Sequence, residues 1–304
     1  MVAIKFSKGD LNMRKVLLAT TALVAVSGVT AANADISISG NYEWEYTTND
    51  AGTTFGDDSH IVIKATNAAD NGMTWTAVHK LGGGSDAVES GGESIINVNQ
   101  AYVQVEGDFG KIQFGDAENS AAQIMSGPLG RNKDIETQVG LGSADTRAGF
   151  IGGAADLTYY SPNMSGFSFG ISKDLTDQDA STTDGTMDFA VKYSMAGMNV
   201  FYGQGEDSTS VGIGGSIAGF TVGVGSRSVD GSSAKANDVG VSYTLANGIK
   251  IAALSANGTA AGGAKTKASN FGASYTLVPG VKLNAETGKV GTNNYSWVAI
   301  NMSF

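Results

Sequence analysis

The sequence predicts an all-β protein, built as a sixteen-stranded antiparallel barrel that spans a membrane. Apolar and polar residues alternate with period two along most of the chain, which is typical of strands with one wet and one apolar face. Short breaks that end in glycine alternate with longer polar breaks, as expected of strands joined in turn at the two ends of one sheet. An N-terminal export signal precedes the first strand.

The N-terminal segment has the three parts of a secretory signal peptide. Residues 13–15 (Met-Arg-Lys) give a charged start, residues 16–26 form an apolar run, and Ala32-Asn33-Ala34 is a small-residue cleavage site. The run is shorter than the roughly 20 apolar residues that a membrane-spanning helix needs. We therefore expect an upstream extension of the reading frame, a signal peptide and one barrel domain: residues 1–12, 13–34 and 35–304.

The first stretch of the mature chain shows the alternation most clearly. One face carries isoleucine and aromatic residues: Ile36, Ile38, Tyr42, Trp44 and Tyr46. The other face is polar throughout and includes Glu43 and Glu45, so it must meet water. A soluble sandwich would also alternate, with its apolar face turned inward. Tyr193, Tyr243 and Tyr275, however, stand at the same offset before three short breaks, which is typical of the aromatic belt at a membrane interface.

The breaks between strands give the strand count. Seven short breaks end in glycine, at residues 69–72, 107–110, 161–166, 194–197, 217–219, 245–248 and 277–280. Eight longer polar breaks alternate with them, at residues 48–57, 82–93, 119–155, 174–185, 205–209, 228–237, 256–267 and 288–293. Fifteen connections join sixteen strands. Pro128, Pro162 and Pro279 all fall in breaks, as expected of residues that cannot donate to a ladder.

The composition excludes several classes of function. The chain has 29 acidic and 19 basic residues, and its formal net charge of −10 becomes −13 without residues 1–34. No basic cluster is present, which argues against a nucleic-acid binder. The absence of cysteine excludes disulfide scaffolds, thiolate metal sites and cysteine nucleophiles. The two histidines, His60 and His79, lack neighbours at the spacing of a zinc site.

The longest break, residues 119–155, differs from the others in length and in charge. It is rich in glycine and holds charged residues of both signs. A connector of this length without secondary structure is uncommon in a compact domain unless it carries function. We therefore expect it to be the working part of the molecule.

Two stretches carry a resemblance to a known family. The segment Gly107-Asp-Phe-Gly-Lys-Ile-Gln-Phe-Gly-Asp116 precedes the long break, and Phe304 ends the chain. Together with the signal peptide and the strand count, they resemble the general diffusion porins of Gram-negative outer membranes, in particular the alphaproteobacterial trimeric porins. The resemblance implies a passive channel for small hydrophilic solutes and ions in the cell outer membrane. It also implies a homotrimer, in contact with outer-membrane lipid and lipopolysaccharide.

The resemblance implies that the third long connector folds into the barrel, where loop acids face basic residues on the opposite wall. The candidates in the constriction loop are Asp134, Glu136, Asp145, Arg131, Lys133 and Arg147. Strand parity adds the pore-wall candidates: Lys64, Lys80, His60, Glu43 and Glu45. We expect Lys64 near mid-height and Lys80 near the long-break end, with Lys250 and Lys282 at the inner mouth. The net charge favours a weak cation preference.

Other interpretations rest on fewer residues. An outer-membrane hydrolase would use a rim histidine, His79, with Asp86 or Glu89, but no nucleophile motif accompanies them. A secreted adhesive β protein would explain the signal peptide but not the alternation of short and long breaks. We predict no enzyme activity and no cofactor. The alternative to a chain without a cofactor is a calcium ion held by loop carboxylates: Asp174, Asp177, Asp179 and Asp184.

Overall fold

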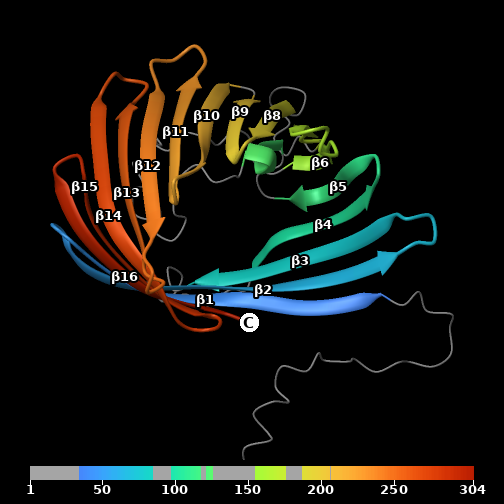
Figure 1. Cartoon of the computed structure of the whole chain (residues 1–304), viewed down its shortest axis with the longest axis horizontal. Coiled ribbons are helices and arrows are strands. Elements are labelled where there is room, and N and C mark those ends of the chain that lie inside the picture. Colours follow the sequence, from blue (N-terminus) through green and yellow to red (C-terminus); the bar gives the residue numbers. More distant parts are fainter. Residues whose placement is uncertain (1–33, 85–96, 118–120, 126–154, 176–186, 206) are drawn as a thin grey trace, which may run out of the picture.

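Sixteen strands close into one antiparallel barrel, which confirms the predicted fold class and strand count (Figure 1). The computed structural model describes residues 34–84, 97–117, 121–125, 155–175, 187–205 and 207–304. The strands are β1 (Asp35–Asn49), β2 (Gly52–Ala68), β3 (Thr74–Gly84), β4 (Asn97–Gly107), β5 (Gly110–Ala117), β6 (Ala155–Tyr160), β7 (Phe167–Lys173), β8 (Met187–Met195), β9 (Met198–Gln204), β10 (Ser208–Ile217), β11 (Phe220–Val229), β12 (Lys235–Thr244), β13 (Lys250–Thr259), β14 (Lys265–Val278), β15 (Val281–Val290) and β16 (Asn293–Ser303). A 3-10 helix, η3 (Ala121–Met125), lies between β5 and β6. Among the described residues, no helix is long and apolar enough to cross a membrane.

The alternating residues divide between an outward and an inward face of the wall. On β12, Val239 and Val241 point outward and are 51% and 39% exposed, whereas Asp238 and Ser242 point inward and are 5% and 4% exposed. Apolar side chains thus cover the outside and polar ones line the inside, which is the reverse of a soluble sandwich. The outward face meets lipid.

Tight hairpins join the strands at the short-break end. Ala196 and Gly197 have φ values of 51° and 79°, and Ala218 and Gly219 have 50° and 84°. Two consecutive residues with positive φ form a type I′ turn, whose twist matches that of the flanking strands. Glycine is favoured at these positions because it alone lacks the Cβ that clashes in this conformation.

The opposite end of the barrel differs from the prediction. The first and last long breaks, predicted at residues 48–57 and 288–293, shrink to two-residue connections because β1, β2, β15 and β16 extend into them. The Asn49 side chain supports the first connection, accepting hydrogen bonds from the backbone N–H groups of Ala51 (2.8 Å) and Gly52 (3.1 Å). Polar residues that continue a ladder beyond the apolar belt were therefore misread as loops. The truly long connections contain residues 85–96, 118–154 and 176–186.

The last strand closes the barrel on the first. β16 pairs with β1 from Asn41–Ser303 to Asn49–Tyr295. Phe304 completes the seam, because its backbone exchanges two hydrogen bonds with Gly40, of 3.0 and 3.1 Å. Among the sixteen described strands no edge is left free in lipid, where unpaired backbone groups would be costly.

Candidate pore and its lining

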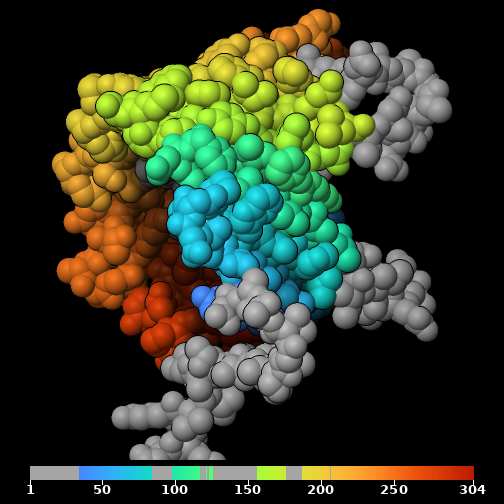
Figure 2. All heavy atoms as spheres, turned by 90° about the vertical axis from the view of Figure 1, so that its right-hand side faces the viewer, coloured from blue at the N-terminus to red at the C-terminus, as the bar shows by residue number. Residues whose placement is uncertain are grey.

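The barrel is hollowed along its axis. Figure 2 shows an opening between the cyan strands of the N-terminal half and the orange strands of the C-terminal half. We call the part nearer the short turns the inner half of the lumen, and the part nearer the long connectors the outer half. Side chains on the inward face of the sixteen strands line both halves.

The start of the long connector lies inside the barrel. Helix η3 rests against the inner face of β7 and β8, where the backbone N–H of Ala121 donates to Ser172 Oγ at 3.1 Å (Figure 1). Ala121 and Met125 pack on the inward Ala190 and Phe201, and all four are buried.

Small residues on the wall make room for this helix. A Cβ added to Gly170 would lie 3.2 Å from the carbonyl oxygen of Ala121, closer than most Cβ contacts. The small side chain of Ala190 allows Met125 to approach β8 in the same way. The six predicted charged residues of the constriction loop, from Arg131 to Arg147, lie outside the described residues.

All five predicted wall residues point inward. Glu43 and Glu45 alternate with the outward Trp44 on β1, while the other three lie on β2 and β3: His60, Lys64 and Lys80. Lys64 pairs with Val78 and Lys80 with Val62, so the two lysines are diagonal neighbours on the same face. Because β2 begins at Gly52, Lys64 lies in the short-turn half of its strand and not near mid-height as predicted.

Two inward aromatic residues were missed in the sequence. Trp297 is 1% exposed, and its indole N–H donates to Glu45 Oε2 at 2.7 Å, across the β1–β16 seam. Tyr295 donates its hydroxyl to Glu286 Oε1, which also accepts from Asn270 Nδ2 at 2.9 Å. Strand parity would have placed both aromatic residues inside the barrel, because they alternate with the outward residues of β16. These bonds fix two carboxylates on the wall.

Charge is separated along the axis of the lumen. Five inward lysines stand in the short-turn halves of their strands: Lys64, Lys111, Lys192, Lys250 and Lys282. Inward carboxylates gather in the long-connector halves, among them Glu43, Glu45, Asp58, Asp188, Asp238 and Glu286. The separation is incomplete, since Asp35 and Glu106 lie in the inner half and Lys80 and Arg227 lie in the outer half. Lys250 and Lys282 stand where the sequence predicted them.

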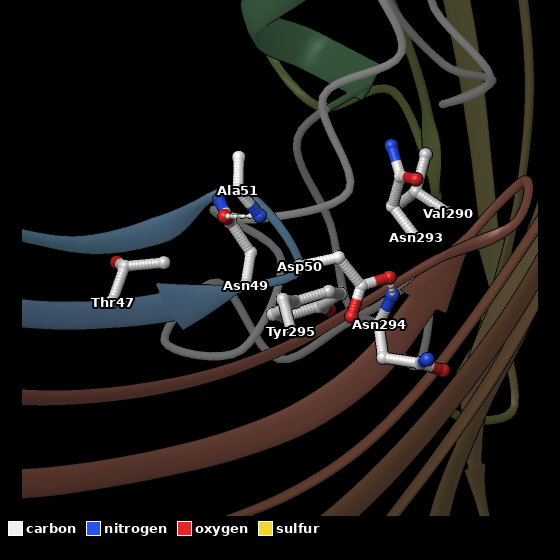
Figure 3. Close-up of a pocket in the computed structure, with 8 residues that line it drawn as sticks. All are labelled: Thr47, Asn49, Asp50, Ala51, Val290, Asn293, Asn294 and Tyr295. Atoms are coloured by element: carbon white, nitrogen blue, oxygen red, sulfur yellow. Dashed lines mark hydrogen bonds between the residues drawn. The ribbon is translucent and has the colours of Figure 1, made fainter.

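A polar pocket marks the rim of the outer half (Figure 3). It has a volume of about 410 Å³ and is lined by Thr47, Asn49, Asp50, Ala51, Val290, Asn293, Asn294 and Tyr295. Asp50 Oδ2 accepts a hydrogen bond from the backbone N–H of Asn294 at 2.9 Å. This bond ties the β1–β2 hairpin to the β15–β16 hairpin at the mouth.

This architecture agrees with one known family. Residues 19–295 match the sequence profile of a family described as Gram-negative porin. The chain belongs to this porin family. It is therefore a passive channel of the outer membrane, and its short turns face the periplasm while its long connectors face outward.

Solved porin structures share the fold at low sequence identity. An anion-selective porin from Comamonas acidovorans matches with 16% identity and a TM-score of 0.69, over 90% of this chain and 100% of that one. A substituted porin of Rh. blastica matches with 16% identity and a TM-score of 0.68, over 89% and 100%. OmpT, an outer membrane protein of Vibrio cholerae in a loop-deleted form, gives 14% and 0.69, over 89% and 99%. No curated protein sequence matches the chain.

The remaining sequence candidates do not assemble into a second site in the described parts of the porin. His79 points outward on β3, paired with Ile63, while Asp86 and Glu89 lie outside the described residues. No group of three or more His, Cys, Asp or Glu among the described residues could hold a metal ion. Of the four predicted calcium ligands only Asp174 lies in the described set. The family and the fold indicate a channel rather than an enzyme.

Proposed function

We propose that residues 119–155 form the constriction of this porin and that the pore prefers cations weakly. The observation that carries the first part is η3, because the connector begins on the inner face of β7 and β8 and not outside the barrel. A wall of sixteen strands alone encloses a wide aqueous channel, and a connector that folds inside the wall narrows this channel. The charges of residues 131–147 would then lie close to passing ions and add to the field of the wall.

The cation preference is supported by the outer half of the lumen. A solute arriving from outside first meets Glu45, Asp58, Asp188, Asp238 and Glu286, which raise the local concentration of cations. Rings of charged side chains set ion selectivity in pores of this kind. The five lysines of the inner half oppose this field, so the preference is weak. Size, and not recognition of one solute, then decides which hydrophilic molecules pass.

Reversal potentials test the proposal. The mature porin, residues 35–304, is inserted into a planar bilayer with a tenfold gradient of KCl, and the zero-current voltage is measured. We expect the sign that corresponds to K⁺ passing more readily than Cl⁻. An anion-selective result would overturn the preference while leaving the channel function intact.

We also propose that three barrels associate through their apolar walls, as is typical of the family. The outward face of β1 supports this, because it stays apolar from Ile36 to Tyr46. Native mass spectrometry of the detergent-extracted porin measures the number of chains, and a single-chain mass would contradict the trimer. The proposal assigns the chain no catalytic step and no cofactor.

A further inference from the structure

A groove crosses the outward face of the wall from β8 to β12. It has a volume of about 640 Å³, and its outward-facing lining is apolar except at one end. The larger side chains of the lining are Tyr193 of β8 and Tyr202 of β9. Tyr202 pairs with the smaller Val211 of β10, and Tyr193 pairs with Val200 of β9, in the row that continues to Val224 of β11. At the end nearer the long connectors, Ser226 and Asn237 pair across β11 and β12 and line the groove with polar groups.

Four lysines gather on the outward face next to this polar end. They are exposed and lie at the long-connector ends of β12, β14 and β15: Lys235, Lys265, Lys267 and Lys289. We call them the lysine rim. None of the four forms an ion pair with another described residue. The outward positions of β11 to β16 hold no carboxylate, and the connectors at residues 260–264 and 291–292 carry no charge. The β11–β12 connector holds one carboxylate, Asp230, which accepts a hydrogen bond from Gln204 Nε2 at 3.2 Å.

The groove and the lysine rim are continuous in the strand register. One row of paired outward positions runs from Val211 through Ser226, Asn237 and Asn257 to Lys267. Lys267 is thus two strands from the polar end of the groove, or about 10 Å at the usual spacing.

The opposite arc of the wall lacks this arrangement. On β1 the outward apolar residues continue to Tyr46, and on β2 they are followed by Phe55 and the acidic Asp57. On β14 the apolar residues stop at Phe271, and Ser269 and Lys267 follow. The cationic surface is therefore a property of one arc and not of the whole rim.

We propose that the groove and the lysine rim bind one phosphorylated, acylated lipid of the outer leaflet. An acyl chain occupies the groove, Ser226 and Asn237 contact its ester or sugar oxygens, and the lysines hold the phosphates. Phosphates carry the opposite charge to the rim, and each lysine near such a surface contributes about fivefold to affinity. The site requires that the long connectors face outward in the outer membrane, and it does not require that the pore conduct ions.

Lipid titration of the purified mature porin in neutral detergent tests this site. Native mass spectrometry follows binding of diphosphoryl lipid A to the unmodified porin and to a variant with Lys235→Gln, Lys267→Gln and Lys289→Gln. Lys173→Gln is the matched control, since Lys173 is an outward lysine at the long-connector end of β7, away from the rim. Circular dichroism checks that each variant keeps its barrel.

We expect the triple variant to lose about 100-fold in affinity and the control to lose none. Lipid A without phosphates should bind the unmodified porin as weakly as diphosphoryl lipid A binds the triple variant. Val211→Trp, which fills the groove, should weaken binding with all lysines in place. An equal loss in Lys173→Gln, or competition by inorganic phosphate at the concentration of the lipid, would reduce the rim to a general anion-binding surface and overturn the proposal. Unchanged binding by Val211→Trp would overturn the role of the groove.

Discussion

The outer and inner halves of the lumen differ in charge, in crowding and in how their side chains are held. The outer half carries η3 on its wall and a group of carboxylates, of which Glu45 and Glu286 accept hydrogen bonds from buried aromatic residues. The inner half carries five lysines on strands joined by tight turns. One barrel wall can therefore present electric fields of opposite sign to solutes that arrive from opposite sides.

A field of this kind should act on current as well as on selectivity. A voltage that drives cations in through the acidic outer half drives anions in through the basic inner half. Both ions then enter where the wall concentrates them, so the pore fills and conducts more. The opposite voltage empties the pore of ions. We therefore expect the current to depend on the sign of the voltage.

The largest change should come from removing the narrowing in the outer half. Deletion of residues 134–145 shortens the long connector but keeps η3 and its contacts with Ser172 and Phe201. We expect single-channel conductance in a planar bilayer to rise roughly twofold, because a sixteen-stranded wall alone keeps a wide aqueous channel. Conductance equal to that of the unmodified porin would place the constriction elsewhere.

A smaller change should come from neutralising one charge in each half. Asp58 and Lys64 lie on the inward face of the same strand, β2, toward its opposite ends. Asp58→Asn should shift the reversal potential by a few millivolts toward Cl⁻, and Lys64→Gln should shift it by a similar amount toward K⁺, because each removes one charge from the wall. Both should reduce the voltage asymmetry of the current.

Asp57→Asn is the matched control for this pair. Asp57 is the neighbour of Asp58 but faces outward, opposite Trp44. Its charge is separated from the lumen by the wall, so its loss should leave the reversal potential unchanged. If Asp57→Asn and Asp58→Asn shift the potential equally, the effect comes from the rim of the channel and the comparison of the two halves fails.

The sequence predicted the strands and their faces because period-two alternation reports directly which side chains face lipid. It failed at the outer strand ends, since the paired segment 52–57 has Phe55 as its one large apolar residue and its composition of glycine, threonine and aspartate is typical of a loop. The tight turns were easier to predict, because a turn that needs a positive φ usually contains glycine, which can be recognised in the sequence.

The site was less predictable than the fold. Inward positions such as Glu45 and Lys64 follow from strand parity, and the sequence found them. The bond between Trp297 and Glu45 joins residues 252 positions apart, and only closure of the barrel brings them together. The seat of η3 likewise depends on Gly170 and Ser172, which no local pattern relates to residues 121–125.

The smallest predicted effect concerns how the outer half holds its charge. Trp297→Phe keeps a buried ring but removes the indole N–H that donates to Glu45 Oε2. Hydrogen bonds to charged groups contribute about 1.5 kcal/mol, so urea unfolding of the lipid-inserted porin should show a loss of that order. Trp44→Phe is the control, because Trp44 faces outward against Phe55 and donates nothing to the lumen. Equal losses in the two variants would mean that ring size, and not the bond to Glu45, sets the stability of the seam, and the outer half would then hold its carboxylates no more firmly than the inner half holds its lysines.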